Sequence, residues 1–461
     1  MVELREPLEQ LIHSPRQFTA GTTFPRANEI RLYDTTLRDG EQTPGVAFSP
    51  EQKFELACML SDAGVHMLDV GFPSAAPSER QSLKYILDAK KSGRITSEIV
   101  VMCRSNSRDI DATLDALAEM GAKPSDCSFF IFTSGSDLHL KYKIGRTLLG
   151  LEGRKAEEWL DLPVSFYREA NIRMSTKAIA HARSRGVEVV EFGGEDGSRA
   201  DVDYLIELAG ACYEAGGARY AYPDTVGFFA PEGVDYYIPR IVAAFPKKPL
   251  VIHFHNDFGL AAYNTVRALH HGATIPTVTV NGIGERAGNA PLHTTVMILK
   301  ELYGVTIPGF RYDMLGQLRL KVEQMSGLPV AAAEPIIGHN VFTHETGIHT
   351  AGITIHPAIY QVIEPDSVGG HLRFLFGKHS GTVAVEAVLK KHEETLHGAG
   401  VDINAKLVQT LLRLIKDIRE RRAAKSDHAD EIRAYYQNLN HLGLTEHDLV
   451  SYALVLGPEL K

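Results

Sequence analysis

The 461-residue sequence has only four cysteines, and they are scattered along the chain: Cys58, Cys103, Cys127 and Cys212. No two of them form a CxxC pair, and this spacing does not match a zinc–thiolate site. We therefore expect four free, buried thiols in a reducing compartment.

Long apolar runs and blocks of one charge are also missing. No stretch approaches the roughly 20 apolar residues that cross a bilayer. The N-terminal segment MVELREPLEQLIHSPRQF lacks the apolar core of a signal peptide. The chain has no Lys/Arg-rich block, and its net charge of −9 argues against a nucleic-acid surface. We expect a cytoplasmic protein without nucleic-acid or membrane partners.

The chain does contain a regular alternation of short apolar runs and amphipathic stretches, which begins after an irregular arm at residues 1–28. Eight β-branched or apolar runs read as strands, each followed by a helical pattern. The expected strands are 29–34, 65–71, 98–103, 127–132, 187–192, 219–224, 249–255 and 277–282. Eight such units in roughly 280 residues predict a closed (β/α)8 TIM barrel. A doubly wound sheet competes, but no GxGxxG sequence follows the first strand.

The alternation ends near residue 308. Residues 334–353 read as a histidine-rich loop, and from 382 the chain reads as helices with charged faces. We predict a barrel over 29–307, a linker or lid subdomain over 308–385 and a mainly helical C-terminal subdomain over 386–461. Within the barrel, the connection 131–170 is long for one βα unit, which indicates a lid or substrate loop, or disorder.

In such a barrel the chemistry lies at the carboxyl ends of the strands. Five expected strands end in polar segments: DTTLRDGEQ, EFGGEDGSR, PDTVG, HFHND and NGIGERAGN. These segments place a set of acidic, basic and amide side chains at one rim: Arg38, Asp39, Glu41, Gln42, Glu195, Asp196, Arg199, Asp224, Thr225, Glu285, Arg286 and Asn289.

The segment HFHND predicts a metal site. Residues i and i+2 of a strand point to the same face, so His253 and His255 should project together. An HxH pair alone is more often two hydrogen-bonded histidines, but the rim position, Asp39 and Arg38 favour a metal. Two imidazoles and the Asp39 carboxylate suit Zn²⁺, Mn²⁺ or a similar divalent ion such as Mg²⁺. Open positions on the ion would let a 2-oxo acid chelate, and Arg38 could stabilise oxyanion charge on its ketone.

A second histidine cluster follows the barrel. The segment THETGIHTAGITIH carries His344, His349 and His356, with Glu345 among them. Imidazole titrates near working pH, so these residues could supply a general acid or base, and a surface accident is the alternative. The glycine-flanked, apolar surroundings indicate partial burial, which favours function. FGKHSG at 376–381 could be an anion-binding turn or a plain helix start.

Eight segments together resemble the isopropylmalate synthase and homocitrate synthase family. They are LYDTTLRDGEQTPG, VGFPSAAPSE, EFGGEDGSRAD, PDTVGFFAP, HFHNDFGLAAYN, NGIGERAGNAPL, NVFTHETGIHTAGI and GKHSG, and they lie in the family's order. The resemblance covers about residues 29–385. It implies an acetyl-CoA-dependent acyltransferase on a metal-bearing (β/α)8 barrel. Such an enzyme condenses acetyl-CoA with a 2-oxo acid in a Claisen-type reaction and releases a 2-substituted malate and CoA.

The resemblance implies roles for residues at the first and sixth to eighth strand ends. Asp39, His253 and His255 match the metal ligands, and Asn289 matches a position that also lies at the metal. A further set matches residues that bind the 2-oxo acid: Arg38 and Gln42 at the reacting carbonyl, and Thr225 at the carboxylate.

The resemblance also implies roles in proton transfer around acetyl-CoA. Glu195 and His349 match residues with that role, and His344 neighbours it. In the family, the loop that carries His349 reaches over the barrel of a second subunit, which implies a domain-swapped homodimer.

Several departures from the family concern the acceptor. Glu191 stands where homocitrate synthases carry an Arg for the distal carboxylate, which favours an isopropylmalate synthase. Such a synthase continues into a regulatory domain of about a hundred residues. The chain stops at Lys461, so we expect no leucine feedback. Gly193 and Gly194 replace a Ser-containing turn, and the loop 141–155 is basic. A specialised acceptor with a phosphonate- or phosphinate-like tail would explain both, and an unregulated isopropylmalate synthase is the alternative.

Two other classes compete with a synthase. A metal-dependent lyase of the same barrel superfamily would cleave a hydroxyacyl-CoA. Such lyases lack a long helical C-terminal module and usually carry a Cys-bearing loop near the end of the barrel, but this chain has no Cys after Cys212. A non-catalytic, metal-stabilised binding protein would have no need of Arg38, Gln42 and Thr225 beside the metal.

Overall fold

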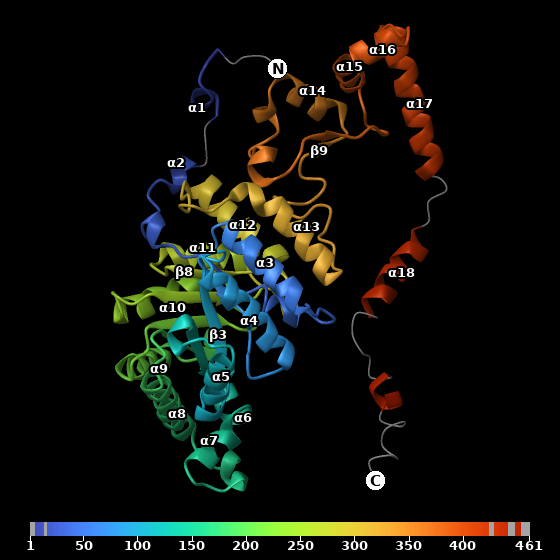
Figure 1. The fold of residues 1–461 in the computed structure, drawn as a ribbon. Helices are drawn as coiled ribbons and strands as arrows, with labels where there is room; N and C mark the ends of the chain where they lie inside the picture. The colour runs from blue at the N-terminus through green and yellow to red at the C-terminus, as the bar shows by residue number, and fades with distance from the viewer. Residues whose placement is uncertain (1–4, 13–15, 424–427, 441–447, 453–461) are drawn as a thin grey trace. The chain divides into compact units, whose positions relative to one another are not determined.

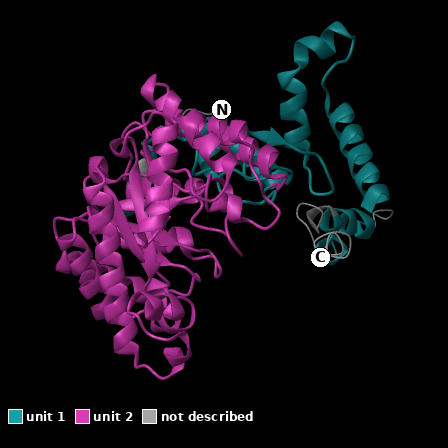
Figure 2. Ribbon diagram, turned by 60° about the horizontal axis from the view of Figure 1, so that its bottom comes forward, with its two compact units in different colours: residues 1–17, 312–316, 330–461 teal, residues 18–311, 317–329 magenta. Residues whose placement is uncertain are grey.

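The computed structural model describes residues 5–12, 16–423, 428–440 and 448–452. These residues form two compact units, coloured separately in Figure 2. One unit comprises residues 18–311 and 317–329, and the other comprises residues 1–17, 312–316 and 330–461. Helix α13, Leu315–Ser326, contributes to both.

The first unit contains a closed barrel of eight parallel strands in chain order, in which β8 pairs with β1 (Figure 1). The strands are β1 Tyr33–Asp34, β2 Met67–Asp69, β3 Glu98–Arg104, β4 Ser128–Ser134, β5 Val190–Glu195, β6 Arg219–Asp224, β7 Leu250–Phe254 and β8 Ile275–Val278. The predicted (β/α)8 fold is confirmed. All eight strands overlap the predicted runs. The overlap is smallest, two residues, for β1, which begins only at Tyr33, and for β8, which ends at Val278.

Helices on the outside of the barrel follow the strands. They are α3 Pro50–Asp62, α4 Pro77–Lys91, α5 Ser107–Glu119, α8 Val164–Ser184, α9 Val202–Glu214, α10 Pro231–Ala244, α11 Ala261–His270 and α12 Leu292–Met297. Helix α3 has the predicted boundaries: Ser49 and Gln52 form a capping box, and Gly64 beyond the last turn has a φ of +84°. That left-handed conformation favours glycine, so the sequence ends this helix locally.

The inside of the barrel is a packed core. Apolar side chains from six strands form a buried cluster: Tyr33, Met67, Val100, Ala221, Val251 and Ile275, with Phe130 packed against it. Burial of each large apolar side chain stabilises the fold by about 1.5–3 kcal/mol. This core closes the barrel below the rim, so that polar side chains at the strand ends lie above a rigid base.

The long connection after β4 is folded, so its interpretation as a disordered segment is wrong. It contains α6 Asp137–Tyr142, α7 Gly145–Leu151 and the 3-10 helix η4 Ala156–Leu160, and both α6 and α7 pack beside α8 (Figure 1). Lys141 donates hydrogen bonds to the carbonyl oxygens of Leu160 and Leu162 at 2.9 and 3.1 Å, which tie the two ends of the insertion together.

The second unit is mainly helical, as predicted. It contains α1 Leu8–Leu11, α14 Gly347–Ile355, α15 Thr382–Lys391, α16 Glu393–Gly398, α17 Ala405–Ala423 and α18 Ala429–Asn440. Two short strands, β9 Thr343–His344 and β10 Arg373–Phe374, pair in parallel. Helix α2, Arg16–Thr19, bridges the boundary in sequence between the two units.

Two expectations about composition can be compared with the structure. Cys58, Cys103, Cys127 and Cys212 are all free and buried, as predicted. Among the described residues, no helix combines the length and the apolar character that a membrane span requires.

Candidate metal centre and active site

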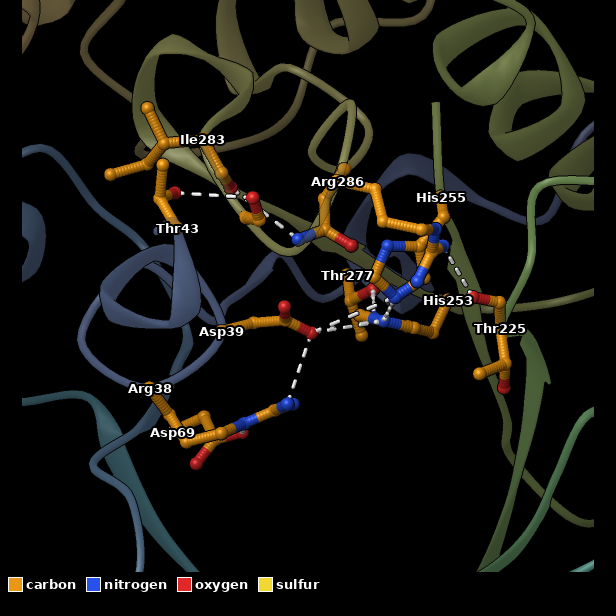
Figure 3. Close-up of polar contacts among 12 residues, drawn as sticks. Arg38, Asp39, Thr43, Asp69, Thr225, His253, His255, Thr277, Ile283 and Arg286 are labelled. Atoms are coloured by element: carbon orange, nitrogen blue, oxygen red, sulfur yellow. Dashed lines mark hydrogen bonds and ion pairs between the residues drawn. The ribbon is translucent and has the colours of Figure 1, made fainter. Parts of the chain in front are cut away.

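Three predicted metal ligands converge at the carboxyl ends of β1 and β7 (Figure 3). The Nε2 atoms of His253 and His255 lie 3.2 Å apart, and they lie 3.2 and 4.0 Å from Oδ2 of Asp39. His253 is on β7, and His255 follows its last residue, where it forms a bridge with Asn289. Two histidines one residue apart therefore face the same carboxylate, as the strand period predicts.

These donor atoms have the spacing that a divalent cation requires, and His255 and Asp39 have the protonation states of metal ligands. Ligand atoms that each lie about 2.1 Å from one ion are themselves about 3–3.5 Å apart. Burial, with the neighbouring His253 second, lowers the pKa of His255 to about 4, so this imidazole is neutral at pH 7. Burial opposes ionisation of Asp39, but the Arg38 guanidinium and a hydrogen bond from His253 outweigh it and hold the pKa of Asp39 well below its usual range. A neutral imidazole and a carboxylate are the ligand forms.

Several polar atoms around this cluster are buried and lack hydrogen-bond partners among the described residues. They are Oδ1 of Asp39, Nδ1 of His255 and Oδ1 of Asn289. Nδ1 of His253, by contrast, contacts Oγ1 of Thr277 at 2.8 Å, which orients the ring with Nε2 toward Asp39. A hydrogen bond at the other ring nitrogen is typical of metal-binding histidines, and the unpaired buried oxygens fit a bound cation.

Arg38 extends from the same turn as Asp39 toward the cluster (Figure 3). Its Nε donates to Asp69 at 2.7 Å, and its Nη1 donates to Asp39 at 3.0 Å. Asp69 is fully buried at the end of β2 and also accepts a hydrogen bond from the backbone of Gly71. The two carboxylates therefore hold the guanidinium in one orientation, with its positive charge directed into the cavity beside the candidate metal ligands.

Thr225, predicted to bind the 2-oxo acid, follows β6, the strand that pairs with β7 beside His253. Its Oγ1 accepts a hydrogen bond from the backbone N–H of Asp196 at 2.8 Å, so its hydroxyl hydrogen is available to a ligand. Asp196 has a φ of +68°, and this left-handed turn after β5 aims the N–H at Thr225. Ser136 and Arg199 hold the carboxylate of Asp196.

Glu195, the last residue of β5, forms an ion pair with Lys143. Lys143 follows α6 in the insertion, and it lines the same cavity as the candidate metal ligands. The sequence indicated only that the loop 141–155 is basic. No local pattern distinguishes Lys143 from Lys141, which binds backbone carbonyls, because the difference depends on how α6 packs.

One cavity of about 330 Å³ brings most of the predicted barrel residues together. Its wall includes ten of them: Arg38, Asp39, Gln42, Glu191, Glu195, Thr225, His253, His255, Glu285 and Arg286. Four further side chains that the sequence did not single out make an apolar wall: Phe72, Met102, Phe130 and Phe132. Asp257 and the carbonyl oxygen of Thr225 hold the guanidinium of Arg286 at 2.6–3.0 Å.

His344 and His349 belong to the second unit, on β9 and α14. Their ring centroids lie 6.2 Å apart, and His349 stacks on Tyr360 at 4.2 Å. Burial and the neighbouring His349 lower the pKa of His344. Ser380, from the FGKHSG turn, donates to the carbonyl oxygen of Glu345 at 3.2 Å. The two motifs after the barrel thus form one local cluster, and their role at the barrel stays a prediction.

Comparisons with known proteins agree with this architecture. The HMGL-like family matches residues 29–157 and 160–313, and the family described as homocitrate synthase post-HMGL domain-like matches residues 336–423. A probable 2-isopropylmalate synthase of Ignicoccus hospitalis is 40% identical over 78% of this chain and 82% of its own length. A putative (R)-citramalate synthase of Methanopyrus kandleri is 36% identical over 86% of this chain and 70% of its own.

Another relative is a homocitrate synthase of Methanothermobacter thermautotrophicus, 34% identical over 89% of this chain and 93% of its own length. Among solved structures, an HMG-CoA lyase from Bacillus subtilis matches 67% of this chain and 97% of its own with a TM-score of 0.51. At 18% identity that likeness supports the barrel fold alone. The two family matches and these relatives show that the chain belongs to the HMGL-like family, in the group of isopropylmalate, citramalate and homocitrate synthases.

Proposed function

We propose that this chain catalyses a Claisen-type condensation of acetyl-CoA with a 2-oxo acid, releasing a 2-substituted malate and CoA. Membership of the synthase family makes it an acetyl-CoA-dependent acyltransferase. One observation carries the proposal furthest: the donor atoms of Asp39, His253 and His255 lie within 4.8 Å of one another, in the wall of the cavity that Arg38 and Thr225 also line.

The residues of the cavity divide the work of binding the 2-oxo acid. A divalent ion held by Asp39, His253 and His255 would act as a Lewis acid on the ketone. Thr225 donates its free hydroxyl hydrogen to the carboxylate of the 2-oxo acid, and Gln42 supplies a further amide from the wall. Arg38, held by two carboxylates, stabilises the negative charge that develops on the ketone oxygen as the carbonyl carbon is attacked. Asn289, whose Oδ1 is buried and has no hydrogen-bond partner among the described residues, would offer a further oxygen beside the ion.

The reaction needs groups that remove and supply protons, and the remaining predicted residues can take these roles. A base takes a proton from the methyl group of acetyl-CoA, and the methyl carbon forms a bond to the ketone carbon. The ketone oxygen takes up a proton, and hydrolysis of the thioester releases CoA. Glu195 lies at the cavity wall with Lys143 as its partner, which keeps its carboxylate directed inward. We assign proton transfer to Glu195 and His349, with His344 beside His349, and propose that the histidines come from a second subunit of a homodimer.

An activity assay with a panel of acceptor 2-oxo acids tests this function. Purified protein with added Zn²⁺, Mn²⁺ or Mg²⁺ is mixed with acetyl-CoA and a series of 2-oxo acids, and the release of free thiol is measured. We expect release that depends on both an acceptor and the metal, and that stops after chelation.

Three outcomes contradict the proposal. Full activity after exhaustive chelation removes the role of the metal. Cleavage of a hydroxyacyl-CoA without net condensation identifies a lyase. Metal binding with no thiol release across the whole panel identifies a binding protein.

A further inference from the structure

The inner end of the active-site cavity is polar, although the interior of the barrel around it is apolar. Glu191 on β5 and Tyr33 on β1 both line the cavity, and both are buried, with exposed fractions of 0% and 1%. Glu191 lies four residues before Glu195, so it is nearer the amino end of the strand than the rim residues are. The cavity therefore has the candidate metal ligands at its rim and a second polar group at its inner end.

Gly193 leaves the cavity open between these two ends. It is on β5, two residues after Glu191 and two before Glu195, so the same face of the strand carries all three. A Cβ at this position would lie 2.6 Å from the carbonyl oxygen of Ala221 and 3.2 Å from the ring of Phe130. No side chain fits without displacing backbone, and the absence of one lets the cavity reach Glu191.

The charges at the inner end balance one another. Oε2 of Glu191 accepts from Nε of Arg219 at 2.6 Å, because the register of the barrel pairs these two residues across β5 and β6. Nη1 of Arg219 continues to Glu98 at 2.8 Å, and Glu98 also binds Arg31 at 2.7 Å. These four side chains thus form one row of ion pairs in which guanidinium groups and carboxylates alternate.

Three polar atoms of this layer have no hydrogen-bond partner among the described residues. They are Oε1 of Glu191, the hydroxyl of Tyr33 and Nη2 of Arg219. Buried polar groups in native proteins are nearly always hydrogen-bonded, so such a cluster in a cavity wall indicates a missing polar partner. Two of the three belong to residues that line the cavity.

We propose that this inner layer is the subsite for the acceptor's side chain, and that it selects 2-oxo acids whose side chain ends in an oxyanion: a carboxylate, a phosphonate or a phosphinate. The proposal rests on the function proposed above. Tyr33 donates its hydroxyl hydrogen to the oxyanion, and Glu191 donates from Oε1 in its protonated form. Arg219, in contact with Glu191, supplies the compensating positive charge.

The surroundings of Glu191 support the protonated form. Burial raises the pKa of Glu191, and the adjacent Arg219 only partly opposes this effect. The other charged groups that act on it are Glu98 on β3 and Asp69 on β2, and both raise its pKa further. A bound oxyanion adds one more negative charge in the same direction. An alkyl end group would instead leave all three polar atoms unpaired, and sites built for polar groups discriminate strongly against such ligands.

Matched pairs of acceptors test the subsite. Oxaloacetate and 4-methyl-2-oxopentanoate have end groups of nearly the same shape, a carboxylate and an isopropyl group. Phosphonopyruvate and 4,4-dimethyl-2-oxopentanoate make the same comparison for a tetrahedral end group. We expect the acidic member of at least one pair to have a kcat/KM at least tenfold above its alkyl partner.

The variant Tyr33→Phe removes one hydroxyl and keeps the ring that packs in the core. We expect the KM for the acidic acceptor to rise about 10- to 100-fold, as for the loss of one hydrogen bond to a charged group. The kcat/KM for the alkyl acceptors should stay within twofold. Tyr220→Phe is the matched control, because the hydroxyl of Tyr220 is also buried and unpaired but its ring packs on Phe192, outside the cavity wall.

Glu191→Gln is the second variant, in case Tyr33→Phe does not fold. Binding of the oxyanion to the wild-type subsite requires protonated Glu191, so the KM for an acidic acceptor should rise as the pH is raised. The amide of the variant donates at every pH, so this rise should disappear.

Two results overturn the subsite. One is a preference for the alkyl member of both pairs. The other is an equal effect of Tyr33→Phe and Tyr220→Phe on all acceptors, which would mean that water alone occupies the inner layer. Absence of thiol release with every acceptor contradicts the proposed function instead, so the two failures are distinguishable.

Discussion

Two clusters in this barrel contain the same three residue types in very different states. At the rim of the cavity, Arg38, Asp39 and His253 lie together with His255. On the outer surface, Arg267 and His271 of the α11 region bind Asp235 of α10. The outer Asp235 accepts hydrogen bonds at both oxygens, at 2.6–2.8 Å, and its partners are partly exposed.

The cluster at the rim differs in burial and in unpaired atoms. Asp39 is 2% exposed, its Oδ1 has no partner among the described residues, and two imidazole nitrogens face each other beside its Oδ2. Residue types alone therefore do not identify a site. Buried nitrogen and oxygen atoms that converge without a hydrogen bond for each of them indicate a bound cation. Exposed groups whose hydrogen bonds are all made indicate an ordinary ion pair.

Replacing one histidine in each cluster should produce the largest contrast. We expect His255→Gln to lower kcat/KM about 10³-fold or more, because loss of a metal ligand removes several kcal/mol of Lewis-acid stabilisation. His271→Gln is the matched control and should leave activity unchanged. Metal content per subunit, measured by mass spectrometry on protein freed of loosely bound ions, should fall only in His255→Gln. Equal metal content in both variants would contradict the assignment of His255 as a ligand.

The sequence predicted the rim cluster because its geometry follows from the fold class. Parallel strands of a closed barrel end at one rim, so DTTLRD and HFH must meet there once the strands are counted correctly. Gln42, Thr225 and Glu195 also follow strand ends at this rim, and all three line the cavity.

Features that depend on register or on tertiary packing could not be predicted in this way. The pairing of Glu191 with Arg219 requires the exact alignment of β5 with β6, which an apolar pattern does not define. The reach of Lys143 into the cavity requires the fold of a forty-residue insertion. β1 also begins later than its apolar run, although Arg31 still donates its backbone N–H to Thr274 beside β8.

Replacing Arg38 and Arg267 by lysine should produce a smaller contrast in activity than the two histidine variants do. Arg38→Lys replaces a planar group that binds Asp69 and Asp39 at once with a point charge that cannot hold both. We expect kcat to fall about 10²-fold, as for loss of one oxyanion donor, with little change in metal content. Arg267→Lys should leave kcat unchanged and lower the free energy of unfolding by less than about 1 kcal/mol. A large fall in melting temperature for Arg38→Lys would point to a structural role instead.

Replacing Asp235 in the outer cluster should produce the smallest effect, a change in the free energy of unfolding that depends on pH. The hydrogen bonds from Arg267, opposed by burial and assisted by His271, lower the pKa of Asp235 to about 2. A carboxyl whose pKa is lower in the folded state stabilises the fold above its unfolded pKa, about 4, and loses this contribution as the pH falls toward 2. At pH 7 we therefore expect Asp235→Asn to lower the free energy of unfolding by less than about 1 kcal/mol, since the pair is partly exposed. Urea unfolding of variant and wild type from pH 7 down to the lowest pH at which both remain folded should show the difference shrinking below pH 4. A difference that stays constant over this range would mean that the hydrogen-bond geometry of Asp235, and not its charge, stabilises the contact between α10 and α11.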